Sequence, residues 1–117
     1  MTTREVIESY FECVNSGRWD DYVELFAENI VMQEQLLGRI EGKADLAKGI
    51  EGLRGNPDFH NYPLEIITEG NIGVALWNIK SPKPNGEMLD LKGANYYTVE
   101  NDKITYFANF HDTKPFE

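Results

Sequence analysis

The sequence predicts an α+β domain in which helices cover one face of a mainly antiparallel sheet. The chain has 117 residues, which fits a single domain spanning residues 1–117 with one core. Apolar residues first recur at helical spacing and then alternate at strand spacing. Short turns join the later strands, which favours antiparallel hairpins, and helices on one face of such a sheet form a two-layer sandwich.

We expect three helices. Thr2 and Glu5 form a capping box at the start of the first helix, and Ser16-Gly17 ends it. A second helix is expected over residues 19–27, and a third over residues 43–53, where Gly49 and Gly52 weaken the helical preference.

We expect five strands, the first of which lies between the second and third helices. Their residue ranges are 30–37, 62–68, 72–80, 88–99 and 104–111. Turn-forming residues separate the last four, most visibly the proline-containing segment 81–86.

Composition and charge exclude several classes of function. The formal net charge of -9 disfavours binding to nucleic acid or to an anionic membrane. No apolar run approaches the ~20 residues of a membrane span, and no apolar signal region is seen, so we expect a cytoplasmic protein. Cys13 is the only cysteine, which rules out an intramolecular disulfide, and we expect it to pack in a helix.

Motifs for metal ions and cofactors are absent from the sequence. It has no glycine-rich phosphate loop, no paired cysteines and no nucleophile elbow. His60 and His111 are the only histidines, and their spacing does not suit zinc. We therefore expect neither a metal nor an organic cofactor.

Polar residues on apolar strand faces are the candidates for a site. Glu34 shares a face with Ile30, Met32 and Leu36, so we expect a poorly solvated carboxylate suited to acid–base chemistry. A bulge, or an ion pair of Glu34 with Arg39 or a lysine, is the alternative. Asn95 lies in a second apolar row and must find a partner in the protein or in a ligand; its row neighbours are Leu89, Leu91, Tyr97 and Val99.

The last strand is apolar on both sides. Alternation places Asp112 on the inner face, and His111 on the other; a bulge would exchange them. The residues that share this inner face with Asp112 are Ile104, Tyr106, Ala108 and Phe110. Tyr10 faces the core, where its hydroxyl either donates to an oxyanion or simply packs. Trp77 is expected in the pocket wall.

Two segments resemble a known superfamily. The run Tyr-Phe-Glu-Cys-Val-Asn-Ser-Gly-Arg-Trp-Asp at residues 10–20, then Leu-Phe-Ala-Glu-Asn-Ile at residues 25–30, is similar to the start of nuclear-transport-factor-2-like proteins. The segment 103–112 resembles their last strand, especially in SnoaL-like polyketide cyclases. The resemblance implies a curved, mixed sheet wrapped around three N-terminal helices, with a cone-shaped pocket between them.

The resemblance also implies roles for particular residues. Glu34 falls where ketosteroid isomerases of this superfamily place a general base, Tyr10 where they place an oxyanion-binding tyrosine, and Asn95 near a second donor. Asp112 falls near an aspartate shared by epoxide hydrolases and SnoaL-like cyclases. Segment 72–77 lacks the arginine and aspartate of the epoxide hydrolases, which disfavours that reaction.

These patterns predict a cofactor-free acid–base enzyme, an isomerase, cyclase or dehydratase acting on an apolar carbonyl compound. Glu34 or Asp112 would move the proton, while Tyr10 and Asn95 would bind the oxyanion. The residues expected to contact the ligand are Asn95, Trp77, Tyr97, Tyr106, Phe110 and His111. The alternative is a non-catalytic binding or dimerisation module. We expect a homodimer through the convex sheet face, where Phe107 would lie.

Overall fold

The computed structural model describes all residues, 1–117, and consists of a curved six-stranded sheet with helices on one face. The elements are, in chain order, α1 (Thr3–Ser16), α2 (Trp19–Glu24), β1 (Phe26–Glu34), β2 (Gly38–Glu41), α3 (Lys43–Gly49), α4 (Glu51–Arg54), β3 (His60–Glu69), β4 (Ile72–Pro82), β5 (Met88–Glu100), β6 (Lys103–His111) and the short 3-10 helix η1 (Lys114–Phe116). The strand order is β2-β1-β6-β5-β4-β3. Every neighbouring pair is antiparallel except β1 and β6, which are parallel, so the predicted mixed α+β class is confirmed.

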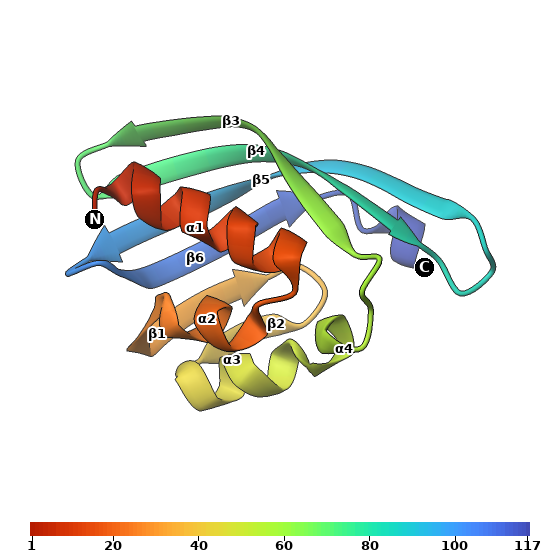
Figure 1. Cartoon of the computed structure of the whole chain (residues 1–117), viewed down its shortest axis with the longest axis horizontal. Coiled ribbons are helices and arrows are strands. Elements are labelled where there is room, and N and C mark those ends of the chain that lie inside the picture. The colour runs from red at the N-terminus through yellow and green to blue at the C-terminus, as the bar shows by residue number, and fades with distance from the viewer.

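The helices divide the inner face of the sheet between them. Figure 1 shows α1 crossing in front of β3 to β6, while α2, α3 and α4 lie beside β1 and β2. The core cluster joins both groups, since it includes Ile7 of α1, Leu46 of α3 and Phe26 of β1. None of the helices has the length and apolar character needed to cross a membrane.

Helix α1 begins and ends as its sequence predicts. The Glu5 amide donates to the Thr2 hydroxyl at 3.1 Å, and the Thr2 amide donates to the Glu5 carboxylate at 2.8 Å, which completes the capping box. Gly17 ends the helix with φ 69°, a left-handed conformation that glycine adopts at little cost.

The boundaries expected between residues 19 and 54 are wrong in three places. Helix α2 stops at Glu24, and β1 already begins at Phe26, because the irregular register between Phe26 and Val31 hides the strand alternation. The predicted strand 30–37 ends at Glu34, and the chain then turns into β2, which adds a sixth strand. The predicted helix 43–53 breaks into α3 and α4 at Ile50, directly after Gly49.

Two bulges bend the sheet. The pairing of β3 with β4 skips Leu64, and the pairing of β5 with β6 skips Thr105. A bulge adds one residue to one strand, so it kinks that strand and reverses the facing of every later side chain. The bulge at Thr105 therefore decides which side chains of β6 point inward.

Two glycines allow close packing on the inner face. A Cβ on Gly73 would lie 2.2 Å from Ile7 of α1, and one on Gly93 would lie 2.5 Å from the indole ring of Trp77. Helix α1 and the Trp77 ring can therefore rest directly on the sheet only because these positions lack a side chain.

We predict that Gly93→Ala destabilises the protein by about 1–3 kcal/mol, because the added methyl group overpacks against the buried Trp77 ring. Gly52→Ala is the matched control, since a Cβ there meets no atom within 4 Å. Because Gly52 lies in α4 and alanine favours a helix more than glycine does, Gly52→Ala should either leave the stability unchanged or raise it by about 0.5–1 kcal/mol. Urea unfolding measures both changes, and equal effects of the two variants would contradict the prediction.

Candidate functional site

A cavity of about 790 Å³ lies between the helices and the inner face of the sheet. Apolar side chains make up 17 of its 32 lining residues, so most of the wall suits an apolar ligand. Polar side chains occur among these apolar ones, and the position of each indicates what the wall can bind. Tyr10, Glu34, Trp77, Asn95 and His111 all line this cavity.

Strand register explains why these residues meet. Residues directly opposite one another on neighbouring strands share a face of the sheet. Trp77, Gly93 and His111 form one inward-facing row across β4, β5 and β6, and the Trp77 and His111 rings are 5.9 Å apart. Asn95 and Asn109 are paired in the next row.

Asn95 is held by two aromatic side chains. The indole Nε1–H of Trp77 donates to Asn95 Oδ1 at 2.8 Å, and Asn95 Nδ2 donates to the Tyr97 hydroxyl at 2.9 Å. Because the indole nitrogen can only donate, Asn95 Oδ1 must face Trp77, and Asn95 Nδ2 must face the opposite side. The Asn95 amide group is thereby turned toward the tyrosines of the core.

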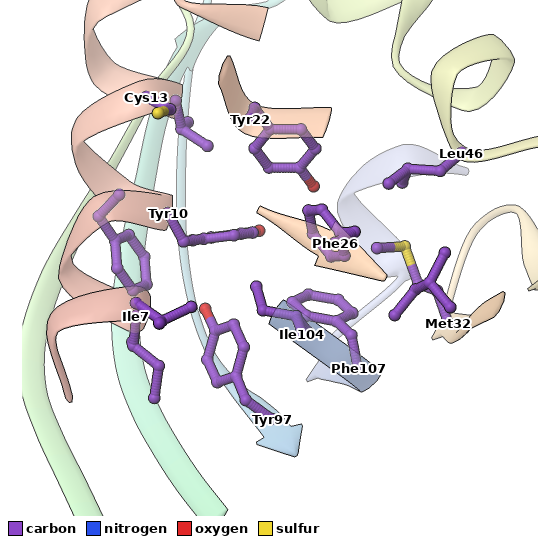
Figure 2. Close-up of a cluster of buried hydrophobic side chains, with 14 of the residues drawn as sticks. Ile7, Tyr10, Cys13, Tyr22, Phe26, Met32, Leu46, Tyr97, Ile104 and Phe107 are labelled. Carbon is purple, nitrogen blue, oxygen red and sulfur yellow. The ribbon is translucent and has the colours of Figure 1, made fainter. Parts of the chain in front are cut away.

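Three tyrosines gather around this amide. Figure 2 shows Tyr10, Tyr22 and Tyr97 in one cluster with Phe26 and Phe107, drawn together from α1, α2, β5 and the neighbouring strands. The Tyr10 ring centroid is 5.2 Å from that of Tyr22 and 5.4 Å from that of Tyr97.

Burial keeps these hydroxyl groups protonated. It raises the pKa of Tyr10 to about 12, although hydrogen bonds with Tyr22 and Asn95 partly offset the rise and the charge of Glu34 adds to it. Burial also raises the pKa of Tyr22 and of Tyr97 well above the ordinary value. At neutral pH the Tyr10 hydroxyl is therefore a hydrogen-bond donor or acceptor without charge.

Glu34 stands at the end of β1, in a setting different from the one expected. Ile30 and Met32 are buried as predicted, but Leu36 lies in the turn and is 47% exposed. The Glu34 carboxylate accepts hydrogen bonds from the amides of Leu36 and Leu37 and, at 3.1 Å, from Asn109 Nδ2. These three donors hold the carboxylate in one position. The alternative of an ion pair with Arg39 is not seen, since Arg39 pairs with Glu41.

His111 presents one ring nitrogen to a backbone carbonyl. Its Nδ1 lies 2.8 Å from the Asp112 carbonyl oxygen, which can only accept, so Nδ1 carries the proton. In the neutral ring Nε2 is then an acceptor. The ring is held between Trp77 and Phe116, whose centroid is 5.7 Å away.

The bulge in β6 overturns several predicted positions. Because Thr105 is skipped in the pairing, Phe107, Asn109 and His111 face inward, whereas Tyr106 and Phe110 lie on the outer face. Tyr106 and Phe110 are therefore not wall residues, and Phe110 is 57% exposed. Phe107 is buried in the core rather than on the convex face.

Asp112 and Tyr97 also depart from expectation. Asp112 follows the end of β6, is exposed, and accepts a hydrogen bond from the Lys114 amide at 2.9 Å, so it lies outside the cavity. Tyr97 is fully buried, and its hydroxyl accepts a hydrogen bond from Asn95, but the residue does not line the cavity. Burial raises the pKa of the Cys13 thiol, as befits a packing residue.

Several polar residues of the cavity were not expected, among them Tyr22, Asn109 and Asn61. Tyr22 could have been found from its helical spacing with Trp19, since a buried hydroxyl needs a partner. Asn109 was assigned to the wrong face because the bulge has no clear mark in the sequence. Asn61 lies near the start of β3, where no alternation singled it out.

The arrangement places a carboxylate and a neutral phenol on one largely apolar wall. The carboxylate can accept a proton, and the phenol can donate a hydrogen bond to an oxygen on which charge develops. No group of three or more histidine, cysteine, aspartate or glutamate side chains is placed to hold a metal ion.

The model of one protein family, described as the SnoaL-like domain, matches residues 7–107. The chain belongs to this family. No protein of curated function matches it significantly.

Solved structures share the fold of this SnoaL-like chain. An NTF2-like protein of unknown function from Burkholderia pseudomallei has a TM-score of 0.89 at 17% identity, over 99% of this chain and 95% of its own. A second structure is SalBIII, an epoxide hydrolase/cyclase-like enzyme with a role in pyran ring formation in the polyether salinomycin. It has a TM-score of 0.85 at 19% identity, over 96% of this chain and 92% of its own. TerC, which was crystallised with polyporic acid, has a TM-score of 0.86 at 16% identity, over 97% of this chain and 94% of its own.

The buried tyrosines predict a loss of stability at high pH. Below the ordinary tyrosine pKa of 10.0, both the folded and the unfolded chain keep the Tyr10 proton. As the pH rises above that value, the unfolded chain releases the proton first, so the folded state is penalised. We expect the free energy of unfolding to fall by about 1.4 kcal/mol per pH unit for each such tyrosine.

Urea unfolding at a series of alkaline pH values measures this slope. Tyr10→Phe should make the slope shallower, whereas Tyr62→Phe, at an exposed ring, is the matched control and should leave it unchanged. An unfolding free energy that stays constant above the ordinary tyrosine pKa would contradict the prediction.

Proposed function

We propose that this SnoaL-like protein is a cofactor-free acid–base enzyme acting on an apolar compound that carries a carbonyl group. The observation that carries the proposal is that Glu34 and Tyr10 line the same largely apolar cavity. They are a proton acceptor and a neutral hydrogen-bond donor. Two proteins of the same fold support a small organic substrate: SalBIII is a cyclase-like enzyme, and TerC was crystallised with polyporic acid.

The proposed reaction begins with the substrate carbonyl against the Tyr10 hydroxyl. Glu34 removes a proton from the carbon next to the carbonyl, and the electron pair moves onto the carbonyl oxygen, where Tyr10 stabilises the enolate. If the substrate also has a carbon–carbon double bond next to the acidic carbon, the anion is a dienolate, and return of the proton from Glu34 to its far carbon gives an isomerisation. If the substrate has a second carbonyl, the enolate carbon forms a bond to that carbonyl carbon and closes a ring, and the alkoxide oxygen produced there takes the proton back from Glu34. Asn95 is a positioning residue here, because Trp77 and Tyr97 already occupy its amide.

The base role rests on Glu34 alone. Asp112 lies outside the cavity, so its carboxylate does not face a substrate bound there. The rival function, a binding module without turnover, needs only the apolar walls. The two differ in whether the Glu34 carboxylate and the Tyr10 hydroxyl change the rate of a proton transfer. The cytoplasmic location stays a prediction.

We predict that the protein accelerates exchange of the α-protons of an apolar ketone, such as 2-tetralone, in deuterated water. Glu34→Gln keeps the volume of the side chain and removes the base, so exchange should slow by about 10²-fold or more. Tyr10→Phe removes the donor and should slow it by about 10²–10³-fold. Proton NMR measures the rates.

Asp112→Asn is the matched carboxylate control and should leave the exchange rate unchanged. Binding of the ketone without any acceleration, or equal rates in the native protein and the Glu34→Gln variant, would favour the binding module.

We also propose that a second copy of the chain packs on the outer face of the sheet. Leu76, Ala94 and Phe110 are directly opposite one another on β4, β5 and β6, and so form one outward-facing apolar row. Leu76 is 40% exposed and Phe110 57%. Contiguous apolar surface of this kind marks interaction sites, and symmetric dimers are the most frequent assembly.

We predict that Phe110→Asp converts a dimer into a monomer, because it places a charge in the buried row of each copy. Met88→Asp is the control, since Met88 is 61% exposed near the β4–β5 hairpin loop, away from this row. Sedimentation velocity at micromolar concentration reports the state, and a monomeric native protein would refute the dimer.

A further inference from the structure

Lys83 is the only lysine or arginine in the wall of the cavity, and it lies at the end remote from Tyr10. Every second residue along the inner face of β4 lines the cavity, and this row continues into the β4–β5 loop: Trp77, Ile79, Ser81 and Lys83. Residues two apart on extended backbone point to the same face. Lys83 is half-buried, and it therefore belongs to the same inner row as Trp77.

The backbone around Lys83 is firmly held. Pro82 and Pro84 flank it, and a proline fixes its own φ and keeps the preceding residue extended. The Lys83 amide donates to the Glu87 carbonyl at 2.7 Å, and the Lys83 carbonyl accepts from the Gly86 amide at 3.0 Å. The loop therefore fixes where the Lys83 side chain starts, beside the cavity.

The Lys83 ammonium group has no acidic partner in the protein. It takes part in none of the salt bridges, whereas Lys80, on the outer face of the same strand, pairs with Asp90 at 3.9 Å. The chain carries 20 acidic residues against 11 basic ones, so partners for a lysine are plentiful. An unpaired cation in the wall of an apolar cavity is available to a ligand.

Asn85 adds an uncharged donor beside this cation. Its Oδ1 accepts from the Glu87 amide at 3.0 Å, so the end of the side chain that stays free is Nδ2, which can only donate. Asn85 lines the cavity two residues after Lys83. Because both free groups are donors, they suit a ligand group that has only acceptors, and a carboxylate is such a group.

The acidic residues of the wall do not cancel the charge of Lys83. Glu34 binds Asn109, whose row across the sheet ends at Ala75 on β4, eight residues before Lys83. At the rise of a strand, eight residues span about 26 Å, well beyond the Debye length of about 8–10 Å. Glu117 also lines the cavity, at the end of the sheet where the β4–β5 loop lies (Figure 1), but it is exposed and does not pair with Lys83.

We propose that Lys83 and Asn85 bind a carboxylate at the open end of the cavity. The apolar body of the ligand would lie along Ile79 and Leu89, which line the wall next to them. One lysine matches the single charge of a carboxylate, whereas a doubly charged phosphate would keep an excess of negative charge in a protein of net charge -9. The inference rests on the proposed function and narrows its substrate class to elongated keto acids, with the ketone at Tyr10 and the carboxylate at Lys83.

Matched probes test this recognition. They are phenyl methyl ketones whose para alkyl chain, lengthened in steps, ends in a carboxylate, a primary amide or an ammonium group. The amide has nearly the shape of the carboxylate without its charge. Quenching of the fluorescence of Trp77 and Trp19, which both line the cavity, reports binding.

We expect the best carboxylate to bind about threefold to tenfold more tightly than the amide of the same length, and the ammonium compound to bind most weakly. Raising the salt concentration from about 0.02 M to about 0.5 M should reduce this preference, because the Debye length shortens.

Variants connect the preference to the residue. Lys83→Met should abolish the preference for the carboxylate and keep the affinity for the amide. Lys83→Glu should reverse the order, so that the ammonium compound binds more tightly than the carboxylate. Lys80→Met is the matched control, since it removes the same charge from the same strand outside the cavity, and it should leave the preference intact.

The outcomes separate this inference from the proposed function. Equal affinities of the native protein for carboxylate and amide at every chain length would overturn the carboxylate site while leaving the proposed function standing. Equal losses of preference in Lys83→Met and Lys80→Met would also overturn it, because the effect would then come from net charge alone. Failure of every ketone to bind would overturn the proposed function and the carboxylate site together.

Discussion

The hydrogen bond from the Trp77 indole to Asn95 organises the interior of this protein. Both residues are almost completely buried, and the bond can form only because Gly93 lets the indole lie flat against β5. Since the indole can only donate, it fixes the Asn95 carbonyl on one side and sends the amide nitrogen toward Tyr97 and Tyr10. The orientation of the Asn95 amide toward these buried tyrosines therefore depends on a contact made outside their own cluster.

The buried side chains of Asn95 and Asn61 contrast in how fully they are satisfied. Around Asn95, the side-chain oxygen accepts from Trp77 and the side-chain nitrogen donates to Tyr97, so both ends of this amide are paired. Around Asn61 an acceptor is left unused. A satisfied network is rigid and specifies one geometry, whereas an unused buried group costs stability.

The helical and antiparallel elements could be predicted because their signals are local. The capping box at Thr2 and Glu5 and the row of β5 around Asn95 are both present as expected. The wrong facing of the side chains of β6 follows from a shift of one residue. Alternation cannot reveal the bulge at Thr105, so Tyr106 and Phe110 exchanged faces with Phe107 and Asn109. Glu34 was correctly placed in the cavity, but its donors come from the turn after β1 and from β6, which no local pattern connects.

The parallel pairing of β1 with β6 has a consequence for how the chain folds. β6 lies between β1 and β5, so the two halves of the sheet join only through the last strand. The bond between Glu34 and Asn109 spans 75 residues of sequence. Contacts of such high contact order raise the entropy cost of the folding transition state and slow folding. During synthesis the β6 side of β1 therefore stays without its partner strand until β6 leaves the ribosome.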